Sequence, residues 1–334
     1  MEWYLPVIWA AIIATAVAMY VMLDGFDLGI GVLFPTTRDE SERDVMMNSV
    51  APFWDGNETW LILGGGGLWV AFPQAYAVIM PAMYLPVIIM LLALVLRGVA
   101  FEFRWVAKPN HLAWDVAFSG GSLMASFAQG VILGGILQGI TVKNGEFAGG
   151  SFDWLTPFSL ICGLGVVAGY ALLAACWLVM KTDGRVADHA RGMIRPLLGL
   201  VAIAAIGVSV WTPLEISRIA QRWFSWPNIA FLWPLPAATA LLGFIVWRGV
   251  ARRHDYAPFF ATLGIFLLCY LGLAISNFPY LVPPTLTVWD TAAAPASQIF
   301  MLIGVLLLLP VILGYTAFVY WTFRGKVRHG EGYH

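Results

Sequence analysis

Long apolar segments follow one another along almost the whole chain and are separated only by short connections. A helix needs roughly 20 apolar residues, at about 1.5 Å each, to cross the hydrocarbon layer of a membrane. Nine segments satisfy this requirement, namely 5–34, 59–80, 83–106, 114–139, 156–180, 194–216, 229–250, 258–279 and 297–322. Because no polar stretch is long enough for a soluble domain, we expect residues 1–334 to form a single polytopic, all-α integral membrane domain.

The distribution of basic residues predicts the orientation of these spans, because cytoplasmic loops are enriched in Lys and Arg. The connections after odd-numbered spans and the C-terminal end carry most of them: Arg38, Arg43, Arg104, Lys108, Lys181, Arg185, Arg191, Arg195, Arg248, Arg252, Arg253, Arg324, Lys326 and Arg328. The opposite connections hold only Lys143, Arg218 and Arg222, and Arg97 lies within a span. The sequence therefore predicts a periplasmic N-terminus and a cytoplasmic C-terminus.

Charge and histidine content exclude two kinds of ligand. The formal net charge of -1 gives no basic field for nucleic acid. The five histidines lie in loops or the tail, at His111, His189, His254, His329 and His334. We therefore expect no metal site in this chain and no haem held between spans by a histidine pair.

Three charged residues lie seven or more residues from the nearer end of a predicted span, where each is costly and functional by default. Asp24 and Asp27 are three residues apart, so they share a helix face, and Arg97 lies at similar depth in the third span. We expect Asp27 and Arg97 to form a buried ion pair. The remaining carboxyl group would then be able to exchange a proton.

A second polar group, in the sequence WDGNETW at 54–60, precedes the second span. Asp55 followed three residues later by Glu58 is typical of a helix N-terminal cap, and Trp54 and Trp60 fit the aromatic belt of a membrane interface. The predicted orientation places this group on the cytoplasmic side, near the depth of Asp24. A cap does not exclude a further role in proton uptake.

Four motifs in this chain closely resemble those of subunit II of cytochrome bd-type quinol oxidases. They are DGFDLGIG at 24–31, NSVAPFWDGNETWLI at 48–62, LRGVAFEFR at 96–104 and TVWDT at 287–291. The resemblance runs essentially from end to end and includes the nine-span layout. The short connection between the sixth and seventh spans favours the cyanide-insensitive-type branch of the family.

The resemblance implies a fold of two four-helix bundles plus one extra helix, shared with a haem-bearing subunit I. It implies a bacterial inner-membrane complex that oxidises quinol and reduces oxygen to water, which generates a proton-motive force without pumping. Two b-type haems and haem d would be ligated by subunit I, and none by this chain. A small single-span third subunit often accompanies the pair, and quinone and lipid complete the expected partners.

The resemblance also suggests roles for individual residues. Asp55 matches a residue of a cytoplasmic proton path near the subunit interface, which would also include Trp54, Glu58 and Asp24. Asp27 and Arg97 match positions close to the haem region. Further candidates within the matched motifs are Asn57, Trp289 and Asp290. Glu58 is the departure from the family pattern, since Gln is the residue expected there.

Two other classes of function remain open. A proton-coupled secondary transporter would use Asp24 and Asp27 as its site, and it would be expected to show interrupted helices at matching positions of two repeats. A purely structural assembly partner would tolerate neutralisation of these acids.

Overall fold

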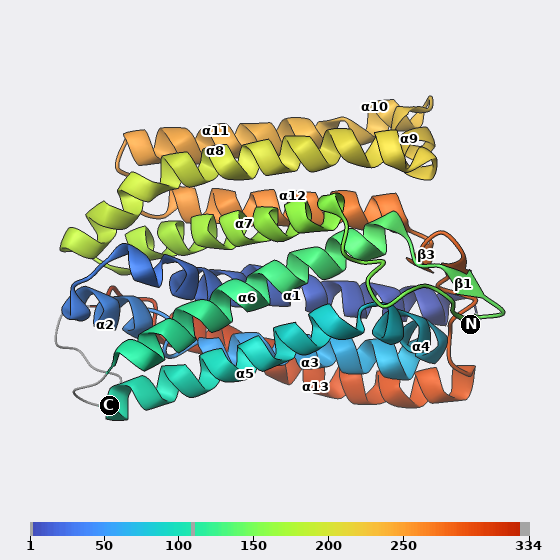
Figure 1. Cartoon of the computed structure of the whole chain (residues 1–334), viewed down its shortest axis with the longest axis horizontal. Helices are drawn as coiled ribbons and strands as arrows, with labels where there is room; N and C mark the ends of the chain where they lie inside the picture. The colour runs from blue at the N-terminus through green and yellow to red at the C-terminus, as the bar shows by residue number, and fades with distance from the viewer. Residues whose placement is uncertain (1–2, 108–110, 328–334) are drawn as a thin grey trace.

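The computed structural model describes residues 3–107 and 111–327, and it is mainly helical (Figure 1). Lys108 and Arg328 of the orientation argument, and His329 and His334, lie outside these residues. The helices are α1 (Tyr4–Leu33), α2 (Glu40–Asn48), α3 (Trp54–Ala71), α4 (Pro73–Ala82), α5 (Tyr84–Val106), α6 (Leu112–Gln138), α7 (Pro157–Lys181), α8 (Gly184–Glu215), α9 (Ser217–Phe224), α10 (Asn228–Leu232), α11 (Pro234–Ala251), α12 (Ala257–Asn277) and α13 (Pro295–Thr322). A 3-10 turn, η1 (Phe34–Thr36), follows α1.

Eight helices within the described part of the chain are long and apolar enough to cross a membrane, and there are nine if one bent pair counts as a span. The exception is the predicted second span, 59–80, which is not one continuous helix. It is divided into α3 and α4, whose axes differ by 119°. Phe72 stands at the break with φ −136° and ψ 62°, because the ring of Pro73 disfavours helical backbone in the preceding residue.

The helices lie roughly along one direction, in layers, with α1 near the middle of the molecule (Figure 1). Helix α1 contacts α3, α6 and α7, and α7 in turn contacts α6, α8 and α12. Helices α8 and α11 form one outer layer, whereas α5 and α13 lie on the opposite side. The predicted grouping into two four-helix bundles and one extra helix stays a prediction.

Glycine allows α1 to approach α7 closely. A Cβ atom at Gly29 would lie 1.9 Å from the Tyr170 carbonyl oxygen, and one at Gly25 would lie 2.7 Å from the Tyr170 ring. Removing the side chain is the only way for the two backbones to come so near, as in small-residue contacts between membrane helices. This contact fixes the rotation of α1, and with it the direction of Asp24 and Asp27.

Short hairpins close the end of the molecule at which α1 begins. Strands β1 (Val142–Lys143) and β2 (Glu146–Phe147) are antiparallel and turn at Asn144 and Gly145, which both have positive φ. Strands β3 (Tyr280–Val282) and β4 (Leu286–Thr287) form the second hairpin.

At the other end, the chain that follows α13 is held by the last residue of α7. The Lys181 ammonium group donates to the carbonyl oxygens of Phe323 and Gly325, and the Val327 amide donates to the Lys181 carbonyl oxygen at 2.8 Å. This clamp fastens the C-terminal end of α13 to α7.

We expect Gly29→Ala to destabilise the assembled protein, because the added methyl group would collide with backbone that cannot move aside. Overpacking of this kind costs about 1–3 kcal/mol. Gly120→Ala is the matched control, since a Cβ atom there meets nothing within 4 Å. Thermal unfolding of both variants in detergent is the measurement, and equal midpoints would contradict the packing role of Gly29.

Candidate functional site

The candidate site is built around two acids in the second half of α1. Asp24 and Asp27 have no exposed surface, and each has one carboxylate oxygen without a hydrogen-bond partner among the described residues. A buried carboxylate is costly unless it is paired or bonded. The partners of the other two oxygens therefore determine what each acid can do.

Arg97 of α5 pairs with Asp24, and not with Asp27 as the sequence predicted. Its Nη1 atom lies 2.9 Å from Asp24 Oδ1, and both side chains are buried. The spacing of the acids could not decide between them, because residues three apart on a helix point about 60° away from each other. The rotation of α1 set by its glycine contact turns Asp24 toward α5.

Asp27 is bonded to an amide instead of a cation. The Asn57 amide nitrogen donates to Asp27 Oδ2 at 2.7 Å, and Asn57 Oδ1 accepts from the Tyr320 hydroxyl at 2.9 Å. Tyr320 stands near the end of α13, so this chain of hydrogen bonds joins α1, α3 and α13. No cation within the described residues lies within ion-pair distance of Asp27.

Helix α3 begins at Trp54, so the predicted cap at Asp55 is not formed. Phe53 occupies the N-cap position, and no side chain caps the helix. The backbone already supplies the partners, because the Trp54 amide donates to the Val50 carbonyl oxygen and the Asn57 amide to that of Phe53. Asp55 lies in the first turn as an exposed residue.

Acids form a graded series from the surface to the core. Asp55 is exposed, the Glu58 side chain is 27% exposed, and Asp24 is fully buried. Glu58 Oε2 lies 3.9 Å from Arg97 Nη1, which also binds Asp24. Trp54 covers the guanidinium group, whose carbon lies 5.8 Å from the centre of its ring. Arg97 thus lies between the outer and the inner acid.

Two tyrosines and a glutamine, which the sequence reasoning missed, continue the polar region. The Gln129 amide donates to the Tyr20 hydroxyl at 2.8 Å, and the Tyr170 hydroxyl donates to Gln129 Oε1 at 2.6 Å. Tyr20 lies one helical turn before Asp24 on α1. In the sequence, only Gln129 could have indicated this polar region, because a glutamine inside a span is unusual whereas tyrosines are common in spans as packing residues.

Trp289 and Asp290 are not part of this site. The Trp289 ring stacks on Trp3, with centroids 4.2 Å apart, next to the start of α1. Asp290 Oδ2 accepts from the amide and the hydroxyl of Thr287, which lowers the pKa of Asp290 from its ordinary value. The TVWDT motif therefore forms a turn next to the N-terminal end of α1, and Asp27 lies near the opposite end of this helix.

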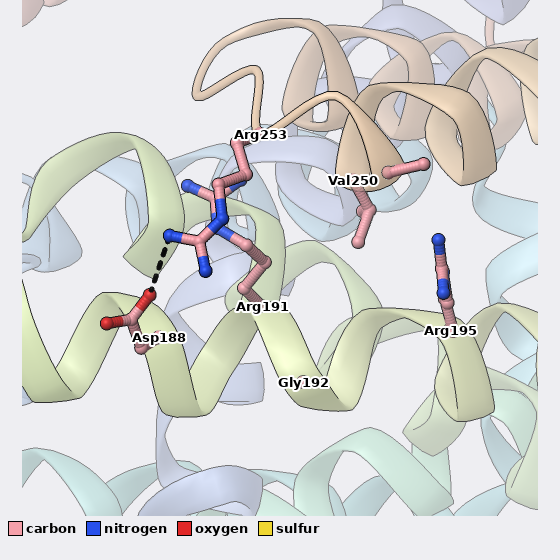
Figure 2. A pocket seen from close by; sticks show the side chains of 7 residues that line it. Asp188, Arg191, Gly192, Arg195, Val250 and Arg253 are labelled. Atoms are coloured by element: carbon pink, nitrogen blue, oxygen red, sulfur yellow. Dashed lines mark ion pairs between the residues drawn. The ribbon is translucent and has the colours of Figure 1, made fainter.

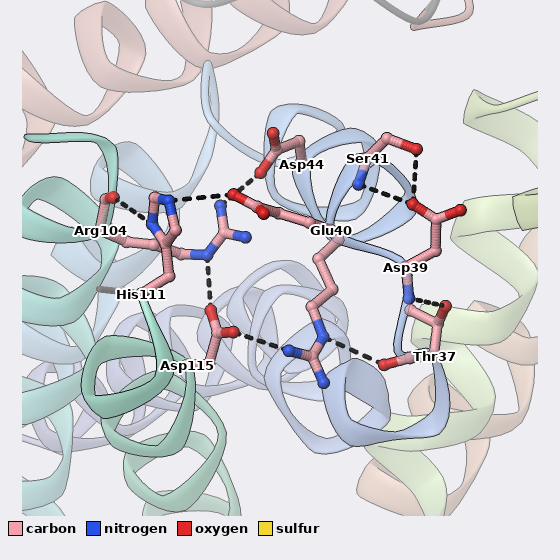
Figure 3. Close-up of polar contacts among 9 residues, drawn as sticks. Thr37, Asp39, Glu40, Ser41, Asp44, Arg104, His111 and Asp115 are labelled. Carbon is pink, nitrogen blue, oxygen red and sulfur yellow. Dashed lines mark hydrogen bonds and ion pairs between the residues drawn. The ribbon is translucent and has the colours of Figure 1, made fainter. Parts of the chain in front are cut away.

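A network of ion pairs holds α2 beside the site (Figure 3). Arg104, which is buried at the end of α5, contacts Asp44 of α2 at 2.5 Å and Asp115 of α6 at 2.6 Å. Arg43 completes the link to Asp115 at 2.7 Å. This network fixes the segment that leads into Trp54 and Asp55.

His111 belongs to the same network and has no free ring nitrogen. Nδ1 lies 3.0 Å from the Arg104 carbonyl oxygen, and Nε2 lies 2.9 Å from Glu40 Oε1. It is the one buried histidine within the described ranges. His111 therefore links the end of α5 to α2 within this network.

Comparison with known proteins agrees with the sequence motifs. The model of the family "Cytochrome bd terminal oxidase subunit II" matches residues 5–323. The chain belongs to this family. It is 30% identical to cytochrome bd-I ubiquinol oxidase subunit 2 of Escherichia coli K12, over 96% of this chain and 94% of that protein. It is also 30% identical to cytochrome bd ubiquinol oxidase subunit 2 of Bacillus subtilis 168, over 97% of both.

The fold agrees as well. A chain from the structure of bd oxidase from Geobacillus thermodenitrificans superposes with a TM-score of 0.75 at 19% identity, over 96% of this chain and 98% of that one. As a cytochrome bd subunit II with many apolar helices, the chain is a multi-pass protein of the bacterial inner membrane. It is one part of an oxidoreductase complex that also contains a subunit I.

We expect Arg97→Gln to reduce the stability of the assembled complex, because it leaves the Asp24 carboxylate buried and unpaired. Removing one partner of such a pair costs about 3–5 kcal/mol. Asp24→Asn in the same background should recover part of this loss. Unfolding midpoints of the single and double variants measure the coupling.

Asp27→Asn is the matched control for this cycle, since it neutralises the neighbouring acid that Arg97 does not bind. We expect it to recover clearly less stability in the Arg97→Gln background than Asp24→Asn does. Equal recovery would show that Arg97 does not distinguish the two acids.

Proposed function

We propose that this chain is subunit II of a terminal oxidase that oxidises membrane quinol and reduces oxygen to water, and that it builds a cytoplasmic proton-uptake path beside subunit I. In this proposal the chain is one membrane domain of nine spans, with a periplasmic N-terminus and a cytoplasmic C-terminus. It consists of two four-helix bundles and one further helix. The complex would generate a proton-motive force without pumping.

The observation that supports this proposal best is the graded series of acids from exposed Asp55 through Glu58 to buried Asp24. A proton path needs groups that exchange protons at successive depths, with water excluded from its inner end. Asp55 and Glu58 are three residues apart on α3, so their side chains share one helix face. A proton bound at Asp55 can therefore pass to Glu58 over a short distance.

Arg97 acts as the fixed charge of the path, because a guanidinium group stays protonated. It stabilises the ionised form of Asp24 directly and that of Glu58 at longer range. Asp24 can take up a proton only by giving up this ion pair, so Asp27 is the inner acid to which we assign proton exchange. It is held by the Asn57 amide, so it can take up and release a proton without breaking an ion pair.

The haems belong to subunit I in this proposal. Two b-type haems and haem d would supply electron transfer and oxygen reduction there, and the residues of this chain would support that subunit and deliver protons. Quinol is the proposed electron donor. A small single-span subunit and lipid are the further partners, and nucleic acid is not one.

We expect Asp55→Asn to lower quinol-driven oxygen consumption at least tenfold in a complex that is assembled and retains its haem spectrum. The amide keeps the shape of the side chain but cannot carry a proton. Oxygen uptake by purified complex with a soluble quinol is the measurement. Glu58→Gln should give a smaller loss, because Asp55 remains at the surface.

Asp290→Asn is the control, because it neutralises a carboxylate near the N-terminal end of α1, away from the series of acids. It should leave turnover unchanged. Unchanged turnover in Asp55→Asn would remove this residue from the proton path. A complex that loses its haems on this substitution would instead indicate a role in assembly.

A further inference from the structure

A cavity lined by arginines lies between the beginning of α8 and the end of α11, and its lining includes no residue of the series of acids. Its volume is about 430 Å³, and its lining comprises Asp188, Arg191, Gly192, Arg195, Val250, Ala251 and Arg253. Figure 2 shows Arg191 and Arg195 rising from successive turns of α8, with Arg253 above them from the turn that follows α11. Three guanidinium groups thus line one cavity.

The charge of this cavity is only partly compensated. Asp188 is the one acid in its lining, and it lies 3.7 Å from Arg253 with both side chains largely exposed. Arg195 has no carboxylate partner within the described residues and lies over the ring of Trp247. Arg191 donates through Nη2 to Asp255 and through Nη1 to the His254 carbonyl oxygen, so it adds charge to the cavity but is already bonded. The lining therefore carries an excess of positive charge, and Arg195 is the cation in it without a carboxylate partner among the described residues.

Asp255, outside the cavity, does not remove this excess. It binds Arg191 at 2.7 Å and Lys326 at 2.9 Å, and Lys326 also binds Asp183 at 2.8 Å. These two acids balance Arg191 and Lys326, and they leave the charge of Arg195 unpaired. Burial raises the pKa of Asp255, but the hydrogen bonds from Lys326 and Arg191 outweigh burial and leave it below its usual value. Asp255 is therefore ionised and holds Arg191 in place at the edge of the cavity.

Apolar surface continues from the cavity along both helices. Only 6% of the residues in the most apolar stretch of α8, and of the segment Asn228–Ala251, are buried. Leu200 and Ile203 of α8 and Phe244 and Trp247 of α11 are exposed beyond the arginines. A soluble anion would gain nothing from this surface, whereas the acyl chains of a lipid would cover it.

We propose that this cavity binds the phosphodiester headgroup of an anionic phospholipid. Arg195 would donate to the phosphate oxygens, Arg191 would add its positive charge from the edge of the cavity, Arg253 would close the site from the turn, and the acyl chains would lie along α8 and α11. Gly192 leaves the floor of the cavity open, since a Cβ atom there meets nothing within 4 Å. Basic pockets between membrane helices on the cytoplasmic side bind such headgroups.

The test uses the whole oxidase complex reconstituted in bilayers of phosphatidylcholine with a minor fraction of phosphatidylglycerol. Native mass spectrometry then counts the phosphatidylglycerol molecules that each complex retains. We expect Arg195→Gln and Gly192→Leu each to lower retention about tenfold, the first by removing a charge-assisted hydrogen bond and the second by filling the cavity. Phosphatidylcholine retention should not change.

Arg252→Gln is the control for charge, because it removes one guanidinium group at the end of α11, next to Arg253, but Arg252 does not line the cavity. It should retain phosphatidylglycerol within twofold of the unsubstituted complex. An equal loss of phosphatidylglycerol in this control would show that the basic surface attracts the lipid without a defined site. Full retention of phosphatidylglycerol in Arg195→Gln or Gly192→Leu would exclude the cavity as the site. Displacement of the lipid by millimolar inorganic phosphate would assign the cavity to a soluble anion and overturn the lipid proposal.

Discussion

The buried ion pair between Arg97 and Asp24 is the interaction on which the rest of the site depends. A guanidinium group cannot be neutralised in the interior of a membrane protein, so its placement requires an acid at the same depth on a neighbouring helix. Once Asp24 meets this need, Asp27 is left to Asn57, and Glu58 is drawn toward the same cation from the outer side. One fixed charge therefore organises acids from both α1 and α3.

Much of this arrangement could be predicted from the sequence. The apolar segments located the membrane helices, and the similar depths of Asp24, Asp27 and Arg97 predicted that these residues lie together. The identity of the pair could not be predicted, because it depends on the rotation of α1 about its axis. That rotation is set by the contact of Gly25 and Gly29 with Tyr170, which is a property of packing across 140 residues of chain separation or more.

Two other predictions were wrong for local reasons, namely the cap at Asp55 and the continuous second span. The sequence pattern of Asp55 and Glu58 was typical of a cap, yet the preceding turn supplies backbone acceptors and frees both acids. The dipeptide Phe72–Pro73 indicates a break in the helix, but apolar residues on both sides of it favoured one continuous span over 59–80. Among the described helices that are apolar enough to span a membrane, this is the single sharply bent pair, so a second interruption of the kind expected of a secondary transporter is not found among them.

The clamp between Lys181 and the chain after α13 has a consequence for how such a protein can be handled. Tyr320, which reaches Asn57 at the inner end of the site, stands only three residues before Phe323, the first clamped carbonyl. Any truncation or fusion that disturbs residues 323–327 would loosen the last turn of α13 and, with it, the amide that orients Asp27. A purification tag on this chain is therefore better separated from α13 by a spacer, or moved to the other subunit.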